Sequence, residues 1–511
     1  MMNQARKEKL KVFLSSLVRK KSIEQASMEA NSSEMKRTLG KIDLISIGIG
    51  CTIGSGVFVL TASIAKEYTG PSIVISFALA GLASSLTAFS YAEMASMVPT
   101  SGSAYTYVIT TMGELAGWMT GWSLVIEYLV GAATIASGWT GYANNLYENM
   151  SGKTIPYLVS NPPINSSATE GNIKIDKDAI MNVPGAIIVA ILTLVLVVGI
   201  QESKLVNNTI VVIKVIAILL FVFFGAKYVS KSNYVPFVPE PVKGTYGVLG
   251  IIRGSQKLFI SYIGFDAVSS AAQEAKNPEK DLPVGIIFSL LFCTLLYIAV
   301  SLILCGVTKY TDIEGGSISK ILSKHPGTKW LEIVINIGAV SGLTSAILVS
   351  LMAHSRLLMA VSNDGMLPSF FGRLHKKFKT PYWASIVTGS VCIILASFFP
   401  VSILSDVTSC GALLVFTFVN VGVIVLKITQ PERKRTYKVP FGPYLCPGLG
   451  AFITVMLLVL SEAQTKLRIG VWLILGLICY FAFSRRHSQI GKPYEIKMKT
   501  RIDDTPDQYQ V

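Results

Sequence analysis

The chain has 511 residues, of which 51% are hydrophobic and only 15% are charged, and its mean hydropathy is +0.54. Soluble proteins carry about 25% charged residues, so this composition excludes a soluble multidomain enzyme. Apolar runs of about 20 residues recur along the sequence, which indicates a membrane protein with several transmembrane helices. The 45 Lys and Arg exceed the 30 Asp and Glu mainly in tails and alternate loops, a pattern of membrane topology rather than of nucleic-acid binding.

Residues 1–41 contain ten Lys or Arg and no apolar core of the kind found in secretory signals, so we expect an uncleaved cytoplasmic tail. Apolar residues within 10–18 fall on one helical face that basic residues flank. This pattern predicts a helix lying on an anionic membrane surface, with an unstructured basic tail as the alternative.

The apolar runs that follow predict an all-α polytopic membrane protein with 12 transmembrane helices. Because the number is even, both termini lie on the same side of the membrane. The distribution of Lys and Arg predicts that this is the cytoplasmic side of a cell membrane. A cytoplasmic tail, 485–511, follows the last helix. The predicted spans are 44–66, 71–97, 113–142, 183–201, 206–228, 246–272, 284–308, 330–360, 382–399, 403–427, 447–463 and 469–484.

The first span contains four glycines within nine residues, Gly48, Gly50, Gly54 and Gly56. Each costs a helix about 1 kcal/mol relative to alanine, which favours a local break. Unwound backbone at membrane depth persists only where it lines a cavity or is buried in protein. The freed amides of Ser55 and Gly56 would then receive a carboxylate at the start of the second half-helix. The alternative is a small-residue helix-packing motif.

The third span carries Glu127 in an apolar stretch, on one helical face with Ser123, Gly131, Thr134 and Gly138. Small residues allow another helix to approach, so this carboxylate points into the bundle. A carboxylate within the membrane is a functional hypothesis by default. Glu127 would balance a bound ammonium or cationic side chain, and a structural hydrogen-bond anchor is the alternative.

The fifth span contains Lys214, roughly 11–15 Å from its polar entrance at 1.5 Å per residue. A buried lysine can carry a coupling proton or replace a metal cation, whereas a lysine stretching to the interface is the alternative. The eighth span places Gly338, Ser341, Gly342 and Ser345 on one face. Its hydroxyls would help to hold a cation or pair with Lys214, and plain packing is equally consistent with the pattern.

The sixth span is interrupted by Gly264 and Asp266. Phe259 and Tyr262 beside this interruption would cover a small ligand, although ordinary packing explains either residue taken singly. Broken helices at matching positions of two halves are the best sequence indication of a transporter site.

Five spans separate the two interruptions, so two copies of a five-span unit would be inverted relative to each other. The predicted units are 42–228 and 246–427, and spans 11 and 12 occupy 447–484.

No motif of an enzyme, cofactor site or metal site is present. The four histidines are scattered, the seven cysteines include no C-x-x-C pair, and neither a P-loop nor a Rossmann glycine pattern occurs. We therefore predict that the chain is not an enzyme and binds no cofactor or metal.

Several motifs resemble the amino acid–polyamine–organocation superfamily, and in particular its cationic amino acid transporter branch. Together they extend over about residues 40–480 and occur in the same order as in the family. They are the glycine-rich run 48–58, the stretch Val98-Pro-Thr-Ser-Gly-Ser-Ala-Tyr105, Tyr262-Ile-Gly-Phe-Asp-Ala267, Lys276-Asn-Pro-Glu-Lys-Asp-Leu-Pro283 and Asn363-Asp-Gly-Met-Leu-Pro368.

This resemblance implies a LeuT-type fold, with ten core helices in a 5+5 inverted repeat plus two extra helices. It implies that the amides of Ser55 and Gly56 hold a substrate carboxylate. The ammonium would meet carbonyls near Thr52, Ile260 and Ile263.

The resemblance also places the usually aromatic gate of the sixth span at Ile260, beside Phe259. It places Glu127 behind the amino-group site and Lys214 where sodium-coupled relatives bind sodium, which implies proton coupling. Leu343 stands where arginine-preferring members carry a small polar residue, so the resemblance leaves neutral amino acids open as substrates.

The sequence thus predicts a secondary active transporter that imports L-amino acids by alternating access, proton-coupled and sodium-independent. A polyamine transporter and an amino acid exchanger are the alternatives within transport, and a channel or a receptor is the alternative from another class. The sequence leaves the side-chain preference and the oligomeric state open.

Overall fold

A computed structural model describes residues 15–31, 37–54, 56–100, 102–166, 173–198, 204–242, 244–313, 317–323, 325, 327–378 and 380–491. The α-helices are α2 (Ile23–Asn31), α3 (Lys41–Thr52), α4 (Thr61–Ile64), α5 (Ile73–Met97), α6 (Ser103–Thr111), α7 (Glu114–Val125), α8 (Gly131–Ser151), α9 (Tyr157–Ser160), α10 (Val183–Val198), α11 (Lys204–Gly225), α12 (Gly247–Leu258), α13 (Ala267–Ser270), α14 (Pro278–Val307), α15 (Ser319–Ser323), α16 (Lys329–Asn363), α17 (Tyr382–Phe398), α18 (Val401–Thr429), α19 (Leu445–Leu460), α20 (Ala463–Cys479) and α21 (Arg485–His487). The 3-10 and π-helical turns that matter below are η1 (Gly56–Leu60), η2 (Ala65–Thr69), η4 (Ile126–Val130) and η7 (Phe259–Tyr262).

Local sequence signals explain where several of these helices begin and end. The helix α14 starts at Pro278, whose missing N–H is not needed in a first turn, and it carries Glu279 and Asp281 there. The helix α8 ends at Gly152, which adopts a left-handed conformation with φ of 69°. This helix continues nine residues beyond the end predicted for the third span, because polar residues lengthen it outside the apolar run.

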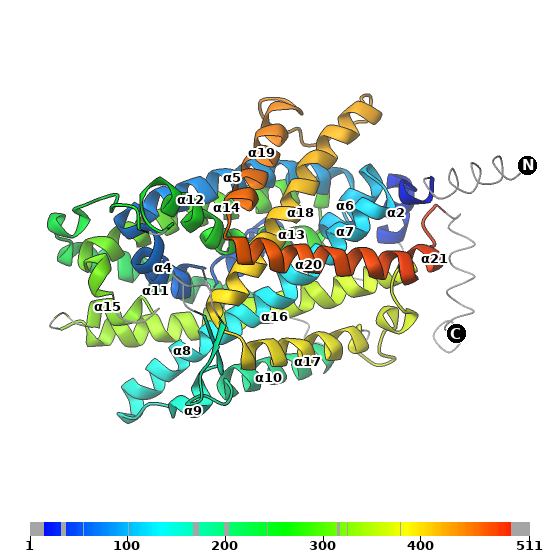
Figure 1. Cartoon of the computed structure of the whole chain (residues 1–511). Helices are drawn as coiled ribbons and strands as arrows, with labels where there is room; N and C mark the ends of the chain where they lie inside the picture. Colours follow the sequence, from blue (N-terminus) through cyan, green and yellow to red (C-terminus); the bar gives the residue numbers. More distant parts are fainter. Residues whose placement is uncertain are drawn as a thin grey trace, which may run out of the picture.

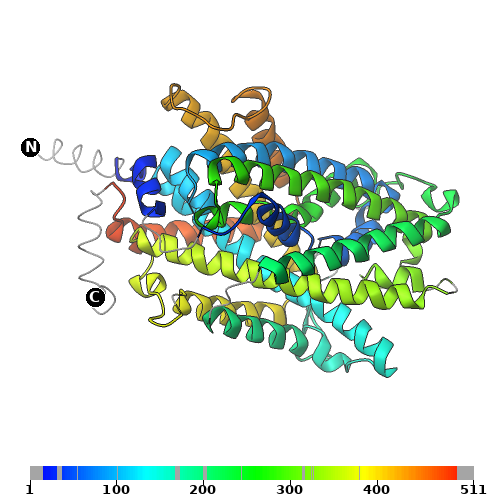
Figure 2. The same ribbon diagram turned by 180° about the vertical axis from the view of Figure 1, so that it is seen from behind.

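The helices form one elongated bundle, which Figures 1 and 2 show from opposite sides. The short helices α2 and α21 lie at one end, which we call the terminal end (Figure 1). The short helices α9 and α15 lie at the opposite end, which we call the loop end.

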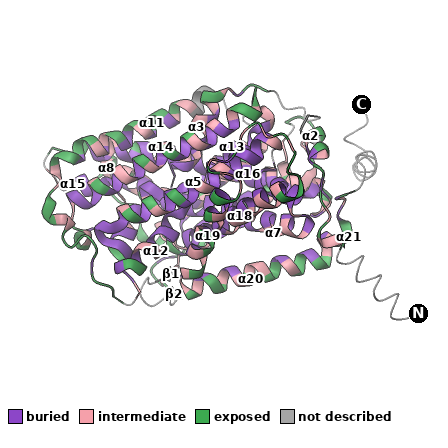
Figure 3. Ribbon diagram, turned by 90° about the horizontal axis from the view of Figure 1, so that it is seen from above, coloured by how far each residue is buried: buried purple, intermediate pink, exposed green. Residues whose placement is uncertain are grey.

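Seven helical segments within the described residues are long and apolar enough to cross a membrane. The longest, Lys41–Met97, combines α3 to α5, and α10, α17 and α19 are shorter apolar helices. Large apolar side chains project outward from the peripheral helices, as at Leu194 of α10 and Leu467 of α20. Figure 3 shows such exposed faces surrounding a buried interior, the arrangement that lipid requires. The chain is therefore a multi-pass helical membrane protein, as predicted.

A small antiparallel hairpin, β1 (Ile164–Ser166) with β2 (Ile173–Ile175), departs from the all-α prediction. It lies in the polar segment between α9 and α10, where the three residues of β1 pair in register with the three residues of β2. Most of the segment 10–18 that we predicted as an interfacial helix lies outside the described residues.

Candidate functional site

The first predicted span is broken in the middle. The helix α3 ends at Thr52, Ile53 takes φ −75° and ψ 85°, and the chain resumes as the π-helical turn η1 at Gly56. Ser55, a predicted carboxylate ligand, lies outside the described residues. The carbonyls before the break lose their partners in the helix and need other donors.

The sixth span is broken in a comparable way. After α12 and the 3-10 turn η7, Ile263 is extended and Gly264 has φ of +126°, a conformation that favours glycine. Asp266 stabilises this turn, because its Oδ1 accepts a hydrogen bond from the Gly264 amide at 3.0 Å. The second half-helix, α13, begins immediately afterwards.

The two breaks lie in backbone contact. A Cβ atom added to Gly264 would lie 2.6 Å from the carbonyl carbon of Cys51, and one added to Gly56 would lie 2.2 Å from the Cβ of Ser261. Such distances exclude any side chain, so glycine is required at both positions for the segments to meet. Gly56 therefore packs against the sixth span and does not face the cavity described below.

Tyr297 of α14 bridges the two breaks. Its hydroxyl donates to the carbonyl of Thr52 at 2.7 Å and to the carbonyl of Ser261 at 2.9 Å, so a single proton serves both interrupted segments. Sequence reasoning missed Tyr297. The available signal was a tyrosine in an apolar helix, whose buried hydroxyl needs a partner.

Lys214 provides the other donor for the broken first span. Its side chain is fully buried, and its Nζ donates to the carbonyl of Gly50 and, at 3.1 Å, to that of Ile53. Gly342 of α16 accommodates the lysine stem, since a Cβ atom there would lie 2.9 Å from the Lys214 Cδ. The ammonium points to the break and not to the membrane interface.

Ser345 was predicted to act together with Lys214. Its Oγ instead donates to the carbonyl of Gly342 in its own helix at 2.9 Å, and Ser341 does the same with Ile337. No hydrogen bond joins Ser345 to Lys214 among the described residues. The small face of α16 thus serves to let Lys214 pass close to the helix.

A cavity of about 30 Å³ lies between the two breaks, α8 and α16. This volume holds about two water molecules, so no amino acid fits without movement of the walls. Four of the residues predicted to bind substrate, Thr52, Glu127, Ile260 and Ile263, line the cavity, whereas Phe259 does not. The other lining residues include Cys51, Tyr128, Ile135, Val349, Ser350, Ala353 and Thr408.

Glu127 faces this cavity from the π-helical turn η4, which interrupts the third span between α7 and α8. Its side chain is 1% exposed, and neither carboxylate oxygen has a hydrogen-bond partner among the residues that the structure describes. The Oγ1 of Thr52 is also buried without a partner. Because an unpaired buried carboxylate is costly, these oxygens are suited to receive a cationic group such as an ammonium.

Asp266 has a different environment from Glu127. Tyr128, the neighbour of Glu127, donates its hydroxyl to Oδ2 of Asp266 and so ties the third span to the sixth. With the Gly264 amide on its other oxygen, Asp266 is occupied in holding the break. Sequence reasoning did not identify this pairing of Tyr128 and Asp266.

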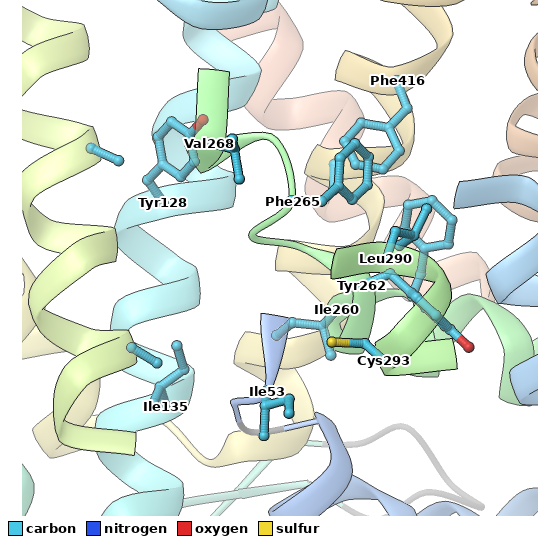
Figure 4. Packing of buried hydrophobic residues seen from close by; sticks show 14 of the residues in the cluster. Ile53, Tyr128, Ile135, Ile260, Tyr262, Phe265, Val268, Leu290, Cys293 and Phe416 are labelled. Atoms are coloured by element: carbon cyan, nitrogen blue, oxygen red, sulfur yellow. The ribbon is translucent and has the colours of Figure 1, made fainter. Parts of the chain in front are cut away.

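The aromatic residues of the sixth span face away from the cavity. The rings of Phe259 and Phe265 pack on Phe416 of α18, with ring centroids 5.3 and 5.1 Å apart. Figure 4 shows Phe265 beside Phe416, with Ile260 lying between this pair and Ile53. An isoleucine, and not an aromatic ring, therefore closes the cavity at this position.

The eighth span contributes Val349, Ser350 and Ala353 to the cavity and not Leu343, where the resemblance had placed a specificity position. Gly342 faces Lys214, so Leu343, one residue further along the helix, is turned toward other neighbours. Leu343 is fully buried in the core.

Comparisons with known proteins identify the family of this chain. The pattern of the family described as amino acid permease matches residues 39–483. The chain is 40% identical over 481 residues to the branched-chain amino acid permease BcaP of Bacillus subtilis (strain 168), covering 93% of this chain and 99% of the relative.

The chain is also 39% identical to the methylthioribose transporter of the same organism, over 94% of this chain and 100% of the relative. It is 34% identical to the vacuolar cationic amino acid transporter 4 of Arabidopsis thaliana, over 82% of this chain and 68% of the relative. These relatives are transporters and not enzymes. The chain belongs to the amino acid permease family of the amino acid–polyamine–organocation superfamily.

Proposed function

We propose that this amino acid permease imports neutral L-amino acids with apolar side chains, in symport with protons and without sodium, by alternating access. The observation that carries the proposal is the cavity between two broken helices, with the unpaired carboxylate of Glu127 facing it. Half-helices that end at a membrane-embedded site offer main-chain dipoles to both charged ends of a zwitterion.

The proposed architecture has 12 transmembrane helices, ten of them in a 5+5 inverted repeat of the units 42–228 and 246–427. Dividing Lys41–Met97 once, before α5, and adding the interrupted α12–α13 segment to the other apolar helices gives twelve. Packing between corresponding spans supports the repeat, because α5 contacts α14, α8 contacts α16 and α10 contacts α17. A twofold axis in the membrane plane brings such equivalents together.

The substrate's two charged ends meet different parts of the site. The ammonium lies against the side chains of Glu127 and Thr52, whose side-chain oxygens have no partner among the described residues. The carboxylate would meet the main-chain amides of Ser55 and Gly56, at the start of the second half of the first span, once the walls move, because Gly56 packs against the sixth span in this closed conformation. The buried Oγ of Ser261 packs against Gly56 and has no partner among the described residues, so it adds a donor there.

The walls of the cavity favour an apolar side chain. Ile135, Ile260, Ile263, Val349 and Ala353 line it, and Glu127 is the only acidic residue among the lining residues. A cationic side chain would need a second carboxylate. Similarity to the branched-chain amino acid permease supports an amino acid with an apolar side chain as the substrate. Similarity to the methylthioribose transporter makes methylthioribose a second candidate, but this compound has no ammonium group to pair with Glu127.

Lys214 carries the coupling proton in this proposal. Its protonated form binds two carbonyls that end the first half-helix, so release of the proton would free those carbonyls and loosen the break. No carboxylate pairs with Lys214 among the described residues. A cation at this position also makes a bound sodium ion unnecessary.

The small volume of the cavity supports alternating access. A space that holds about two water molecules belongs to a closed conformation, from which either side must open to admit a substrate. We place the terminal end on the cytoplasmic side of the cell membrane, because basic residues concentrate in the two tails.

Uptake into proteoliposomes tests the proposal. Leucine, arginine, spermidine and methylthioribose are offered under an imposed proton gradient or an imposed sodium gradient, separately. Accumulation of leucine driven only by protons is expected. Sodium-driven uptake, or accumulation of spermidine or methylthioribose in preference to leucine, would contradict the proposal.

A further inference from the structure

Another buried lysine, Lys257, lies between the cavity and the loop end. Lys257, near the end of α12, is 6% exposed and binds both carboxylate oxygens of Asp406 on α18, at 2.6 and 2.8 Å. The carboxylate of Glu462, just before α20, lies 3.5 Å from the same Nζ. Neither the coupling step nor substrate binding, as described above, uses this cluster.

The cluster also includes Tyr68, from the loop-end half of the first broken span. The ring of Tyr68 in η2 lies under the ammonium of Lys257, 4.6 Å from Nζ, and its hydroxyl donates to Glu462 at 3.0 Å. One lysine therefore joins the loop-end halves of both broken spans to α18 and to the start of α20.

A short polar connection links this cluster to the cavity. Ser409, one turn beyond Asp406, donates to the carbonyl of Lys257 and accepts from the amide of Ile260, both at 3.2 Å. Ile260 and Thr408 both line the cavity. Movement of α12 away from α18 would break the ion pair and remove the wall formed by Ile260 in the same motion.

We propose that Lys257, Asp406, Glu462 and Tyr68 form a gate that closes the substrate cavity on the loop-end side. The gate is shut in this structure, and substrate entry from that side requires α12 and η2 to separate from α18. A buried ion pair contributes little net stability, because desolvation offsets attraction, so holding one of two conformations is a role that fits its retention.

Labelling of Cys51 tests the gate. This native cysteine lines the cavity, and a membrane-impermeant maleimide reaches it only when one side is open. The background carries Cys479→Ser and Cys410→Ser, to remove an exposed thiol and one beside the gate. Adding Cys51→Ser identifies the signal. Right-side-out and inside-out vesicles present the two ends of the molecule separately.

The gate variant is Lys257→Met/Asp406→Leu, which replaces both charges with apolar groups of similar volume and avoids an unpaired charge. We expect labelling of Cys51 from the loop-end side to rise about tenfold, which corresponds to about 1.4 kcal/mol in the open–closed equilibrium. Unchanged labelling of the folded variant, or an increase from the terminal end, would overturn the proposal.

Two further variants make the result specific. The control variant Arg435→Met/Glu93→Gln removes another buried ion pair, with a distance of 3.0 Å between the charged groups. This pair joins α5 to the segment between α18 and α19, so its loss should not increase labelling from the loop-end side. If the main double variant fails to fold, Tyr68→Phe/Glu462→Gln weakens the same gate, and its labelling should rise about threefold. An unchanged rate in that variant would then contradict the gate.

The inference rests on the alternating access proposed above, but the two can fail separately. Labelling reports access to Cys51 without any transport, whereas proton-driven uptake reports coupling. Increased labelling with sodium-driven uptake would keep the gate and refute the coupling proposal.

Discussion

Two of the buried lysines, Lys257 and Lys214, lie beside the broken helices, and their surroundings differ in kind. Lys257 is held by the carboxylates of Asp406 and Glu462, so its charge is neutralised by fixed negative groups. Lys214 is held only by the main-chain carbonyls of Gly50 and Ile53, which exist as free acceptors because the first span is broken. The comparison teaches that a broken helix can replace a carboxylate as the partner of a buried cation.

This difference assigns different tasks to the two residues. A lysine between carboxylates keeps its charge and holds two elements together until they separate, which suits a gate. A lysine bound by neutral dipoles can gain and lose a proton without leaving an unpaired carboxylate behind, which suits coupling. Each of the following changes tests one part of this distinction.

The largest effect is expected for Lys214→Ala. Loss of the ammonium leaves two buried carbonyls unpaired, at about 1–3 kcal/mol each, and removes the proposed proton carrier. Leucine accumulation under a proton gradient should fall to the level of protein-free liposomes. Lys320→Ala, which removes an exposed lysine paired with Glu148, serves as the control and should accumulate leucine normally. Undiminished proton-driven accumulation by Lys214→Ala would show that Lys214 is structural.

A smaller loss is expected for Gly264→Ala, which pushes apart the two breaks on which the Lys214 site depends. Strain at φ of +126° and overlap with Cys51 should together destabilise the fold by about 2–6 kcal/mol. Thermal unfolding in detergent measures this loss. Gly470→Ala on α20, where nothing lies within 4 Å of the added Cβ, is the matched control and should leave the melting temperature nearly unchanged. Equal stability of the two variants would refute the close contact.

Glu127→Gln should weaken leucine binding by about 1–3 kcal/mol, because the amide cannot balance an ammonium. Isothermal titration or a thermal-shift series with leucine measures the affinity. Glu148→Gln, at the loop end of α8, provides an exposed carboxylate as the control. If Glu127→Gln binds leucine as the parent does, Glu127 is a structural anchor and the ammonium site lies elsewhere.

The smallest effect is expected for Tyr297→Phe, which removes the hydroxyl between the carbonyls of Thr52 and Ser261. The loss of about 1 kcal/mol should slow proton-driven uptake several-fold without unfolding the protein. Tyr234→Phe removes a comparable tyrosine–carbonyl bond to Leu302 outside the site and should transport at the parent rate. Equal rates for both variants would contradict a role for the bridge.

The fold was predictable where the signal is local. Apolar runs gave the positions of the long helices, and the glycines from 48 to 56 predicted the break after α3. Gly264 and Asp266 similarly predicted the second break. The face that carries Glu127 was also correct, because small residues at helical spacing mark a close helix contact.

Contacts between distant segments could not be predicted in this way. The partner of Lys257 lies 149 residues away on another helix, and nothing in either segment alone indicates the pair. Ser345 was misjudged because a serine in a helix can satisfy itself with its own main chain. The choice between Phe259 and Ile260 depended on one residue of register in a 3-10 turn, which sequence periodicity does not resolve.

The central claim is that leucine and a proton cross together because Lys214 binds the broken helix. Proteoliposomes with an internal pH indicator and no imposed gradient test it most directly when leucine is added outside. The account predicts that the lumen acidifies in step with leucine entry and that Lys214→Ala gives no acidification. Leucine entry without any proton movement in the parent protein, or equal acidification in both proteins, would contradict it.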